Sequence, residues 1–290
     1  MPDVWTLASV FTKALMYFGF LTSGGLVLIR FAYSSDIAPV LPDMRRMALY
    51  CGVIALIASV LSFVLRGAAL TGDATGLTDT EMLGMMWQTP VGTALVFRVV
   101  GAVVILTGLL LGRIGWGLAG TGALIALWSF VAIGHVSTET AFWPKIVLMG
   151  HLLAVAFWIG ILHPLKRLAD TPEQIQAAGR LGHRFGQTAM FVIPSLLLAG
   201  LILSWLLVGK WSNLWGTLYG LTLVAKLCAV SAVLCLGAWN KKRSVPALIA
   251  QRPGSAKHLS RVLAVEWIIF SLVLLFSAWL TTSVVVPKSI

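Results

Sequence analysis

Eight stretches of this sequence are each long and apolar enough to cross a lipid bilayer as a helix, and this feature limits the possible folds most. A bilayer core of about 30 Å needs about 20 apolar residues in helical conformation. The stretches fill most of the 290 residues. We therefore expect an all-α polytopic integral membrane protein, a bundle of eight transmembrane helices forming one transmembrane domain over residues 1–290. The expected spans are residues 5–30, 47–70, 91–111, 114–134, 146–162, 188–208, 216–238 and 262–282.

The composition excludes the soluble classes of protein. Charged residues make up 11% of the chain and hydrophobic residues 59%, and the mean hydropathy is +0.94. Soluble domains carry about 25% charged residues, so a soluble enzyme and a nucleic-acid-binding domain are excluded despite the net charge of +11. The apolar residues form unbroken runs, whereas an outer-membrane barrel needs alternation.

The distribution of Lys and Arg predicts the orientation, because cytoplasmic loops of membrane proteins are enriched in these residues. One set of connections holds 14 of them, and the opposite set, which includes both ends of the chain, holds only Lys145, Lys210 and Lys288. We expect both termini in the periplasm, with the chain in the inner membrane. The basic set is Arg30, Arg45, Arg46, Arg113, Lys166, Arg167, Arg180, Arg184, Lys241, Lys242, Arg243, Arg252, Lys257 and Arg261.

Three cations are expected inside the outer half of the membrane: Lys13, Arg66 and Arg98. Ionisable groups at such depth are functional candidates by default. They could equally be structural, since Arg66 can extend its head toward the surface and Arg98 can bond helix-end carbonyls. Acids of the outer connections could also pair with them, namely Asp73, Asp79, Glu81 and Glu139.

A second group of polar residues runs from the midplane to the cytoplasmic end. Lys226 is expected near the midplane, and Glu266, the only acid inside a span, lies on the next helix about one turn from the cytoplasmic surface. Consecutive helices are usually adjacent, so we expect Lys226 and Glu266 to pair. Asn240 stands where its helix leaves the membrane. These three residues would line a transport path, with the pair acting either as a fixed link or as a gate.

Two histidines are expected at matching depth near the outer face, His135 at the end of the fourth span and His151 at the start of the fifth. Neutral imidazole and thioether ligands together suit Cu(I). The sequence thus predicts a copper site, Cu(I) more than Cu(II), centred on both histidines. The methionines are alternatively the apolar face of an interfacial helix. The candidate thioether ligands are Met82, Met85, Met86 and Met149.

The order of several short motifs resembles the CopD family of copper resistance membrane proteins. The resemblance implies an inner-membrane protein that handles copper between periplasm and cytoplasm, mostly by uptake, together with a periplasmic copper-binding protein of the CopC type. It carries over to His135, His151, Lys226, Asn240 and Glu266, and does not extend to the methionines. The motifs are Thr89-Pro-Val-Gly92, Phe97-Arg98, Gly134-His135, His151-Leu-Leu-Ala, Phe157-Trp-Ile-Gly160, Lys226, Asn240-Lys-Lys-Arg243 with Pro246, and Ser260-Arg261 with Glu266.

Three functions stay open on the sequence alone. The first is a copper permease without enzymatic activity; no nucleotide-binding loop is visible, so transport would be passive or driven by an ion gradient. The second is a b-type haem electron carrier, an oxidoreductase, with His135 and His151 as axial ligands and the outer cations pairing with the haem propionates. The third is a membrane receptor for a periplasmic copper chaperone.

Overall fold

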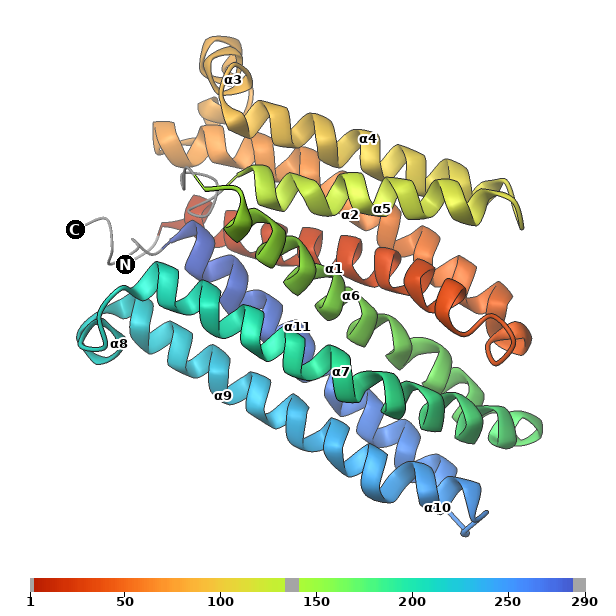
Figure 1. Cartoon of the computed structure of the whole chain (residues 1–290). Coiled ribbons are helices and arrows are strands. Elements are labelled where there is room, and N and C mark those ends of the chain that lie inside the picture. Colours follow the sequence, from red (N-terminus) through yellow and green to blue (C-terminus); the bar gives the residue numbers. More distant parts are fainter. Residues whose placement is uncertain (1–2, 134–140, 284–290) are drawn as a thin grey trace.

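The fold is a bundle of long helices, in a computed structural model that describes residues 3–133 and 141–283 (Figure 1). Within these ranges, eight helices are long and apolar enough to cross a membrane, which confirms the expected all-helical architecture and number of spans. They are α1 (Val4–Ala32), α2 (Leu41–Thr71), α4 (Pro90–Leu110), α5 (Gly115–Ala132), α6 (Trp143–Asp170), α7 (Ile175–Val208), α9 (Leu218–Trp239) and α11 (Ser255–Thr282).

Short helical elements lie at both ends of the bundle. The end where α1 begins and α11 ends also carries η2 (Ala74–Leu77), α3 (Thr80–Trp87) and α8 (Asn213–Gly216) (Figure 1). The opposite end carries η1 (Ala38–Val40), η3 (Pro172–Gln174) and α10 (Val245–Ile249). A π-helical turn, η4 (Asn240–Ser244), joins α9 directly to α10. An even number of spans thus returns the chain to the end where it began.

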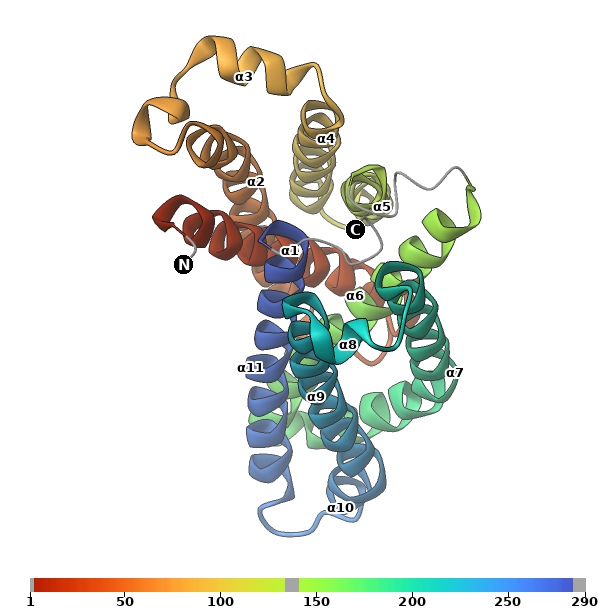
Figure 2. The same cartoon turned by 90° about the vertical axis from the view of Figure 1, so that its left-hand side faces the viewer.

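The helices are longer than the apolar runs on the basic side. The fifth predicted span ended at residue 162, but α6 continues through Pro164 to Asp170, and α7 begins at Ile175 rather than at residue 188. The added segments are rich in Leu, Ala, Gln, Lys and Arg, which are good helix formers whether or not lipid surrounds them. The helix α7 is curved as well as long (Figure 2).

The centre of the bundle is α1, which packs against α2, α5, α6 and α11. Figure 2 shows α2, α4 and α5 on one side of α1, with α6, α7, α9 and α11 on the other. The crossing of α1 and α6 brings backbone against backbone: a Cβ on Gly25 would lie 2.0 Å from the Ala156 carbonyl oxygen, and one on Gly160 would lie 2.3 Å from the Gly25 carbonyl carbon. Small residues permit such close approach between membrane helices.

The outside of the bundle suits lipid, and the basic end suits water. Large apolar side chains such as Phe191, Leu110 and Ile268 are exposed along the spans. The basic end holds three ion pairs, which neutralise only part of its positive charge. They are Arg167–Asp43 at 2.8 Å, Arg184–Asp36 at 2.5 Å and Lys166–Asp170 at 2.7 Å.

Candidate functional site

The imidazole of His151 is held in one tautomer inside the bundle. It lies on α6, and its Nδ1 is 3.3 Å from the Leu196 carbonyl oxygen on α7. A carbonyl oxygen only accepts, so Nδ1 carries the hydrogen and Nε2 keeps its lone pair. The ring fits over Gly200, where a Cβ would lie 3.4 Å from Cε1. A histidine fixed in this way through Nδ1 is typical of a metal ligand that binds through Nε2.

Lys226 is the second residue that the sequence predicts deep inside the membrane and that the structure describes. It lies on α9 and is half-buried. The sequence placed Lys226 at the midplane but did not associate it with His151. The two residues lie on helices separated by α7 and α8 in the chain, and no hydrogen bond joins them among the described residues.

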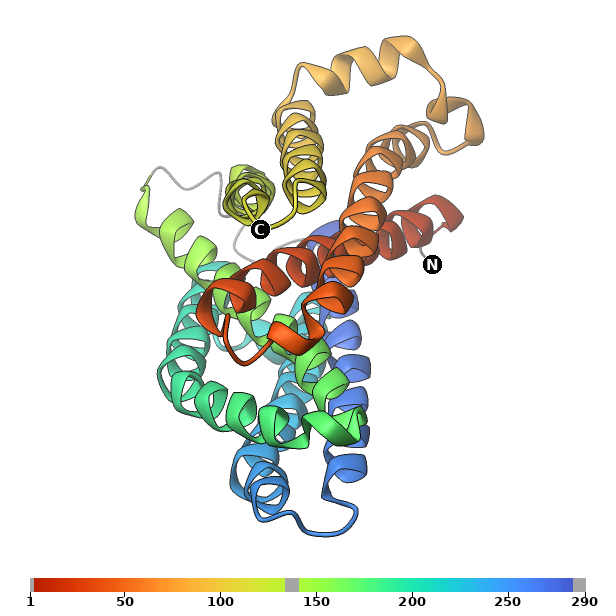
Figure 3. The ribbon, with the colours of Figure 1, turned by 90° about the vertical axis from the view of Figure 1, so that its right-hand side faces the viewer.

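The structure does not bring the predicted thioether ligands to His151. The helix α3, which carries Met82, Met85 and Met86, packs on α2 and α4, away from α6 (Figure 2; Figure 3). Met149 lies two positions from His151 on α6 and so points to a different face of that helix. His135 lies outside the described residues, and its role stays a prediction. No group of three or more His, Cys, Asp or Glu side chains suited to a metal ion exists in the described ranges.

The placement of α3 agrees with the alternative interpretation of its methionines. Asp79 caps the helix by accepting from the Glu81 and Met82 amides, both at 3.0 Å. Met86 is buried while Met85 is exposed, and the Trp87 ring packs edge-on against Phe63. These are the contacts of a short amphipathic segment lying across the end of the bundle.

The three outer cations converge on one cavity of about 340 Å³. Lys13 reaches it from α1, Arg66 from α2 and Arg98 from α4. The Lys13 Nζ donates to the Thr281 carbonyl oxygen on α11 at 2.9 Å. The Arg98 Nε donates to the Ser129 hydroxyl at 3.2 Å, and its guanidinium carbon is 5.3 Å from the centre of the Phe130 ring. The sequence identified each cation singly; their convergence is a finding of the structure.

The acids expected to neutralise these cations are used elsewhere. Asp73 accepts from the Thr75 amide at 2.9 Å and from the Thr75 hydroxyl at 2.5 Å, and Asp79 caps α3. Among the residues that the structure describes, no acid forms an ion pair with Lys13, Arg66 or Arg98. Glu139 lies outside them.

Glu266 is buried and bonded to an amide rather than to a cation. The Asn240 Nδ2 donates to Glu266 Oε1 at 2.5 Å, and both side chains are at most 7% exposed. The expected ion pair between Lys226 and Glu266 is therefore wrong for this structure. The helices α9 and α11 are adjacent as predicted, but Lys226 precedes Asn240 by almost four turns of helix, or about 20 Å. The Asn240 Oδ1 is buried and has no partner among the described residues.

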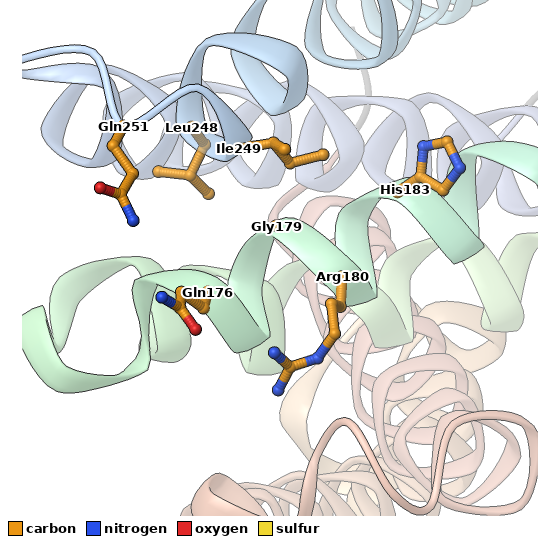
Figure 4. A pocket seen from close by; sticks show the side chains of 7 residues that line it. All are labelled: Gln176, Gly179, Arg180, His183, Leu248, Ile249 and Gln251. Carbon is orange, nitrogen blue, oxygen red and sulfur yellow. The ribbon is translucent and has the colours of Figure 1, made fainter.

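A second cavity, of about 270 Å³, lies between α7 and α10 at the basic end. Figure 4 shows Leu248 and Ile249 of α10 above Gly179, with His183 further along α7. The Ile249 side chain approaches within 3.0 Å of where a Gly179 Cβ would be. His183 is the single imidazole lining it, and no acid of the described chain accompanies it, so it is a packing gap without a ligand set.

This architecture, with eight membrane-crossing helices and polar groups enclosed among them, defines a multi-pass membrane protein. Two family models match the chain: "Copper resistance protein D-like, N-terminal domain" over residues 1–143, and "Copper resistance protein D" over residues 179–280. Between them they cover most of the sequence, and the chain belongs to the CopD family of copper resistance proteins. Searches of curated proteins and of solved structures returned no match.

The matched segments divide the bundle in a simple way. The first covers α1, α2, α4 and α5, and the second covers most of α7 together with α9 and most of α11. Lys226, Asn240 and Glu266 fall inside the second segment. His151, on α6, falls between the two. Membership of the family makes this a membrane protein of copper resistance or homeostasis.

Proposed function

We propose that this protein transports copper across the bacterial inner membrane, with Cu(I) as the cargo and uptake into the cytoplasm as the direction. The observation that carries the proposal is His151, whose Nδ1–H bonds the Leu196 carbonyl, so that its Nε2 lone pair has no hydrogen-bond partner among the residues that the structure describes. A neutral imidazole is a good ligand for copper, and membership of a copper resistance family supports copper as the cargo.

The proposed path runs from His151 toward the Asn240–Glu266 pair. Conduction needs sites that bind weakly enough to release the ion, and a single imidazole with few co-ligands meets that condition better than a closed site. His135 would complete the outer site. At the other end, the unpartnered Asn240 Oδ1 and the Glu266 carboxyl offer oxygen groups inside the bundle.

The proposed orientation has both termini in the periplasm. The Lys and Arg bias supports it, because the basic residues gather at the end of the bundle opposite to α3 and α8. In this orientation α3 faces the periplasm, where a copper-binding protein of the CopC type would deliver its ion. The protein would act as a carrier of ions rather than as an enzyme.

Transport is tested with purified protein in proteoliposomes supplied with Cu(I) under reducing conditions. We expect time-dependent copper uptake by the wild type, lowered at least about tenfold by His151→Ala, since even indirect support of a metal ligand contributes that much. His183→Ala is the matched control, because His183 is an exposed histidine at the basic end and should transport normally. Equal uptake by all three proteins and by empty vesicles would contradict the proposal and leave a receptor role.

The haem alternative has one observation in its favour, since an imidazole that donates through Nδ1 and keeps the lone pair of Nε2 also suits an axial ligand. Its other support is weakened, because no residue of α6, α7 or α9 lines the cavity that holds the outer cations. Propionates placed there would belong to a group bound away from His151. An absorption spectrum of the purified protein decides: a Soret band that responds to dithionite and disappears in His151→Ala replaces the permease with an electron carrier.

A further inference from the structure

The cavity at the outer end of α1, α2, α4 and α11 gathers positive charge without a counter-charge. Lys13, Arg66 and Arg98 all line it, and no acidic side chain among the described residues does. Arg98 is buried, Lys13 is half-buried and Arg66 is exposed, so the three like charges line the cavity from its interior to its mouth. A buried charge is unfavourable without a partner, and the charge pattern indicates a missing anionic group.

Hydrogen-bond donors in this cavity are left free as well. Lys13 has three donors and uses one on the Thr281 carbonyl; Arg98 has five and uses its Nε on Ser129. Arg66 makes no hydrogen bond within the described residues. The Ser9 hydroxyl, on a lining residue only 8% exposed, also has no partner there. Buried polar groups are nearly always bonded, so the cavity is suited to a ligand with several acceptor oxygens.

The remaining walls and the depth of the cavity suit a lipid. Phe63, Leu70, Val91 and Leu95 line it beside the cations. The three cations lie about 8 to 14 Å along their helices from the ends at this face, so the cavity extends from the headgroup region into the outer half of the apolar core. A volume of about 340 Å³ is in the range of small-molecule sites and leaves space beside a single anionic group.

We propose that this cavity binds the phosphate group of an anionic phospholipid. The phosphate oxygens would accept from Lys13, Arg66 and the terminal nitrogens of Arg98, and the glycerol and upper acyl chains would contact the apolar wall. A free phosphate shares the chemistry of the headgroup, but it would leave the apolar wall uncovered. The proposal does not depend on copper transport, because the cavity is separate from His151.

The test is native mass spectrometry of the detergent-purified full chain titrated with phosphatidylglycerol or with phosphatidylcholine of the same acyl chains. We expect the wild type to prefer the anionic lipid and Lys13→Gln/Arg66→Gln to bind it at least about tenfold more weakly, since hydrogen bonds to charged groups contribute strongly. The control Lys145→Gln/Lys210→Gln removes two cations at the same end of the bundle that do not line the cavity, and should keep the preference.

A further variant separates loss of charge from loss of fold. Arg66→Lys keeps the charge and should retain most of the preference, and retention of the wild-type melting temperature by Lys13→Gln/Arg66→Gln shows that the bundle is intact. Equal preference in the cavity variant and the wild type would overturn the proposal. Binding of inorganic phosphate by the wild type, with no preference between the two lipids, would overturn the lipid assignment and give the cavity to a free anion.

Discussion

Two regions of this protein place ionisable side chains among the helices, and they compensate the charge in different ways. At the outer end, Lys13, Arg66 and Arg98 share a cavity without an acid from the described chain. Toward the basic end, Glu266 is buried without an ion pair in the described part of the chain and accepts a hydrogen bond from the neutral amide of Asn240. The outer region gathers three positive charges. The inner region holds one carboxyl, which accepts a hydrogen bond from a neutral amide.

This difference shows which groups compensate the charge in each region. A single carboxyl can be held by a neutral donor, because one good hydrogen bond offsets much of its loss of water. Three cations cannot compensate one another, so their partner must come from outside the described helices. The carboxyl of the inner region is therefore compensated by a donor of the chain itself, although the Asn240 Oδ1 has no partner among the described residues. The outer region is completed by a ligand.

The largest effect should follow from breaking the inner region. Asn240→Ala removes the donor and leaves the Glu266 carboxyl buried without it, which should lower the free energy of unfolding by about 2 kcal/mol. The measurement is thermal unfolding of the purified protein in detergent, followed by intrinsic fluorescence or by loss of soluble protein.

The matched control removes both partners at once. Replacing a bonded pair by apolar groups is close to neutral, so Asn240→Leu/Glu266→Leu should unfold nearer to the wild type than Asn240→Ala does. If the loss of stability in the double variant equals the sum of the losses in the two single variants, the two residues are not coupled. The hydrogen bond between Asn240 and Glu266 would then not stabilise the inner region.

A smaller effect is expected from removing one outer cation. Arg98→Met loses the hydrogen bond to Ser129 and the contact with Phe130, but it also removes one of the three like charges that line the cavity. We expect a net change of less than about 1 kcal/mol in detergent without anionic lipid. Added phosphatidylglycerol should raise the melting temperature of the wild type more than that of Arg98→Met; an equal rise in both would remove the reason for treating the outer region as a ligand site.

The smallest effect is expected for an acid near the outer region. The hydrogen bonds from Thr75 lower the pKa of the Asp73 carboxyl below its usual value of 3.8. A lowered pKa means that its stabilising contribution is present above the ordinary value and is lost only as the pH falls through the lowered one. Asp73 therefore stays ionised at both pH 5 and pH 7, and Asp73→Asn should leave lipid preference unchanged at both. A gain in anionic lipid binding by this variant would instead identify Asp73 as a counter-charge of the cations.

The sequence was sufficient for the spans but not for the full helices. Apolar runs locate all eight, because the bilayer requires a fixed apolar length. The runs do not show where the helices begin and end. The helix α6 continues through polar residues to Asp170, and α7 begins among polar residues at Ile175. Helical hydrogen bonds need neither lipid nor apolar side chains, so hydropathy gives no signal at these ends.

The sequence predicts the residues of the candidate site one by one, but not which of them contact one another. The rarity of charge inside spans was enough to select Lys13, Arg66, Arg98, Lys226 and Glu266. Which of them meet depends on the rotation and vertical offset of each helix, and neither is encoded in hydropathy. For that reason the sequence paired Lys226 with Glu266 across adjacent helices, whereas in the structure the hydrogen-bond partner of Glu266 is Asn240.

The contact between Gly25 and Gly160 has a consequence for dividing the chain. Cut in the α5–α6 connection, the protein would give two fragments of four spanning helices each, and α1 of one would have to recognise α6 of the other without a covalent link. The Gly25–Gly160 crossing allows that recognition backbone to backbone, and a side chain as small as that of alanine would obstruct it. Coexpressed halves should therefore assemble with both glycines in place and stay apart with Gly160→Leu, which makes this crossing the joint between the two halves of the molecule.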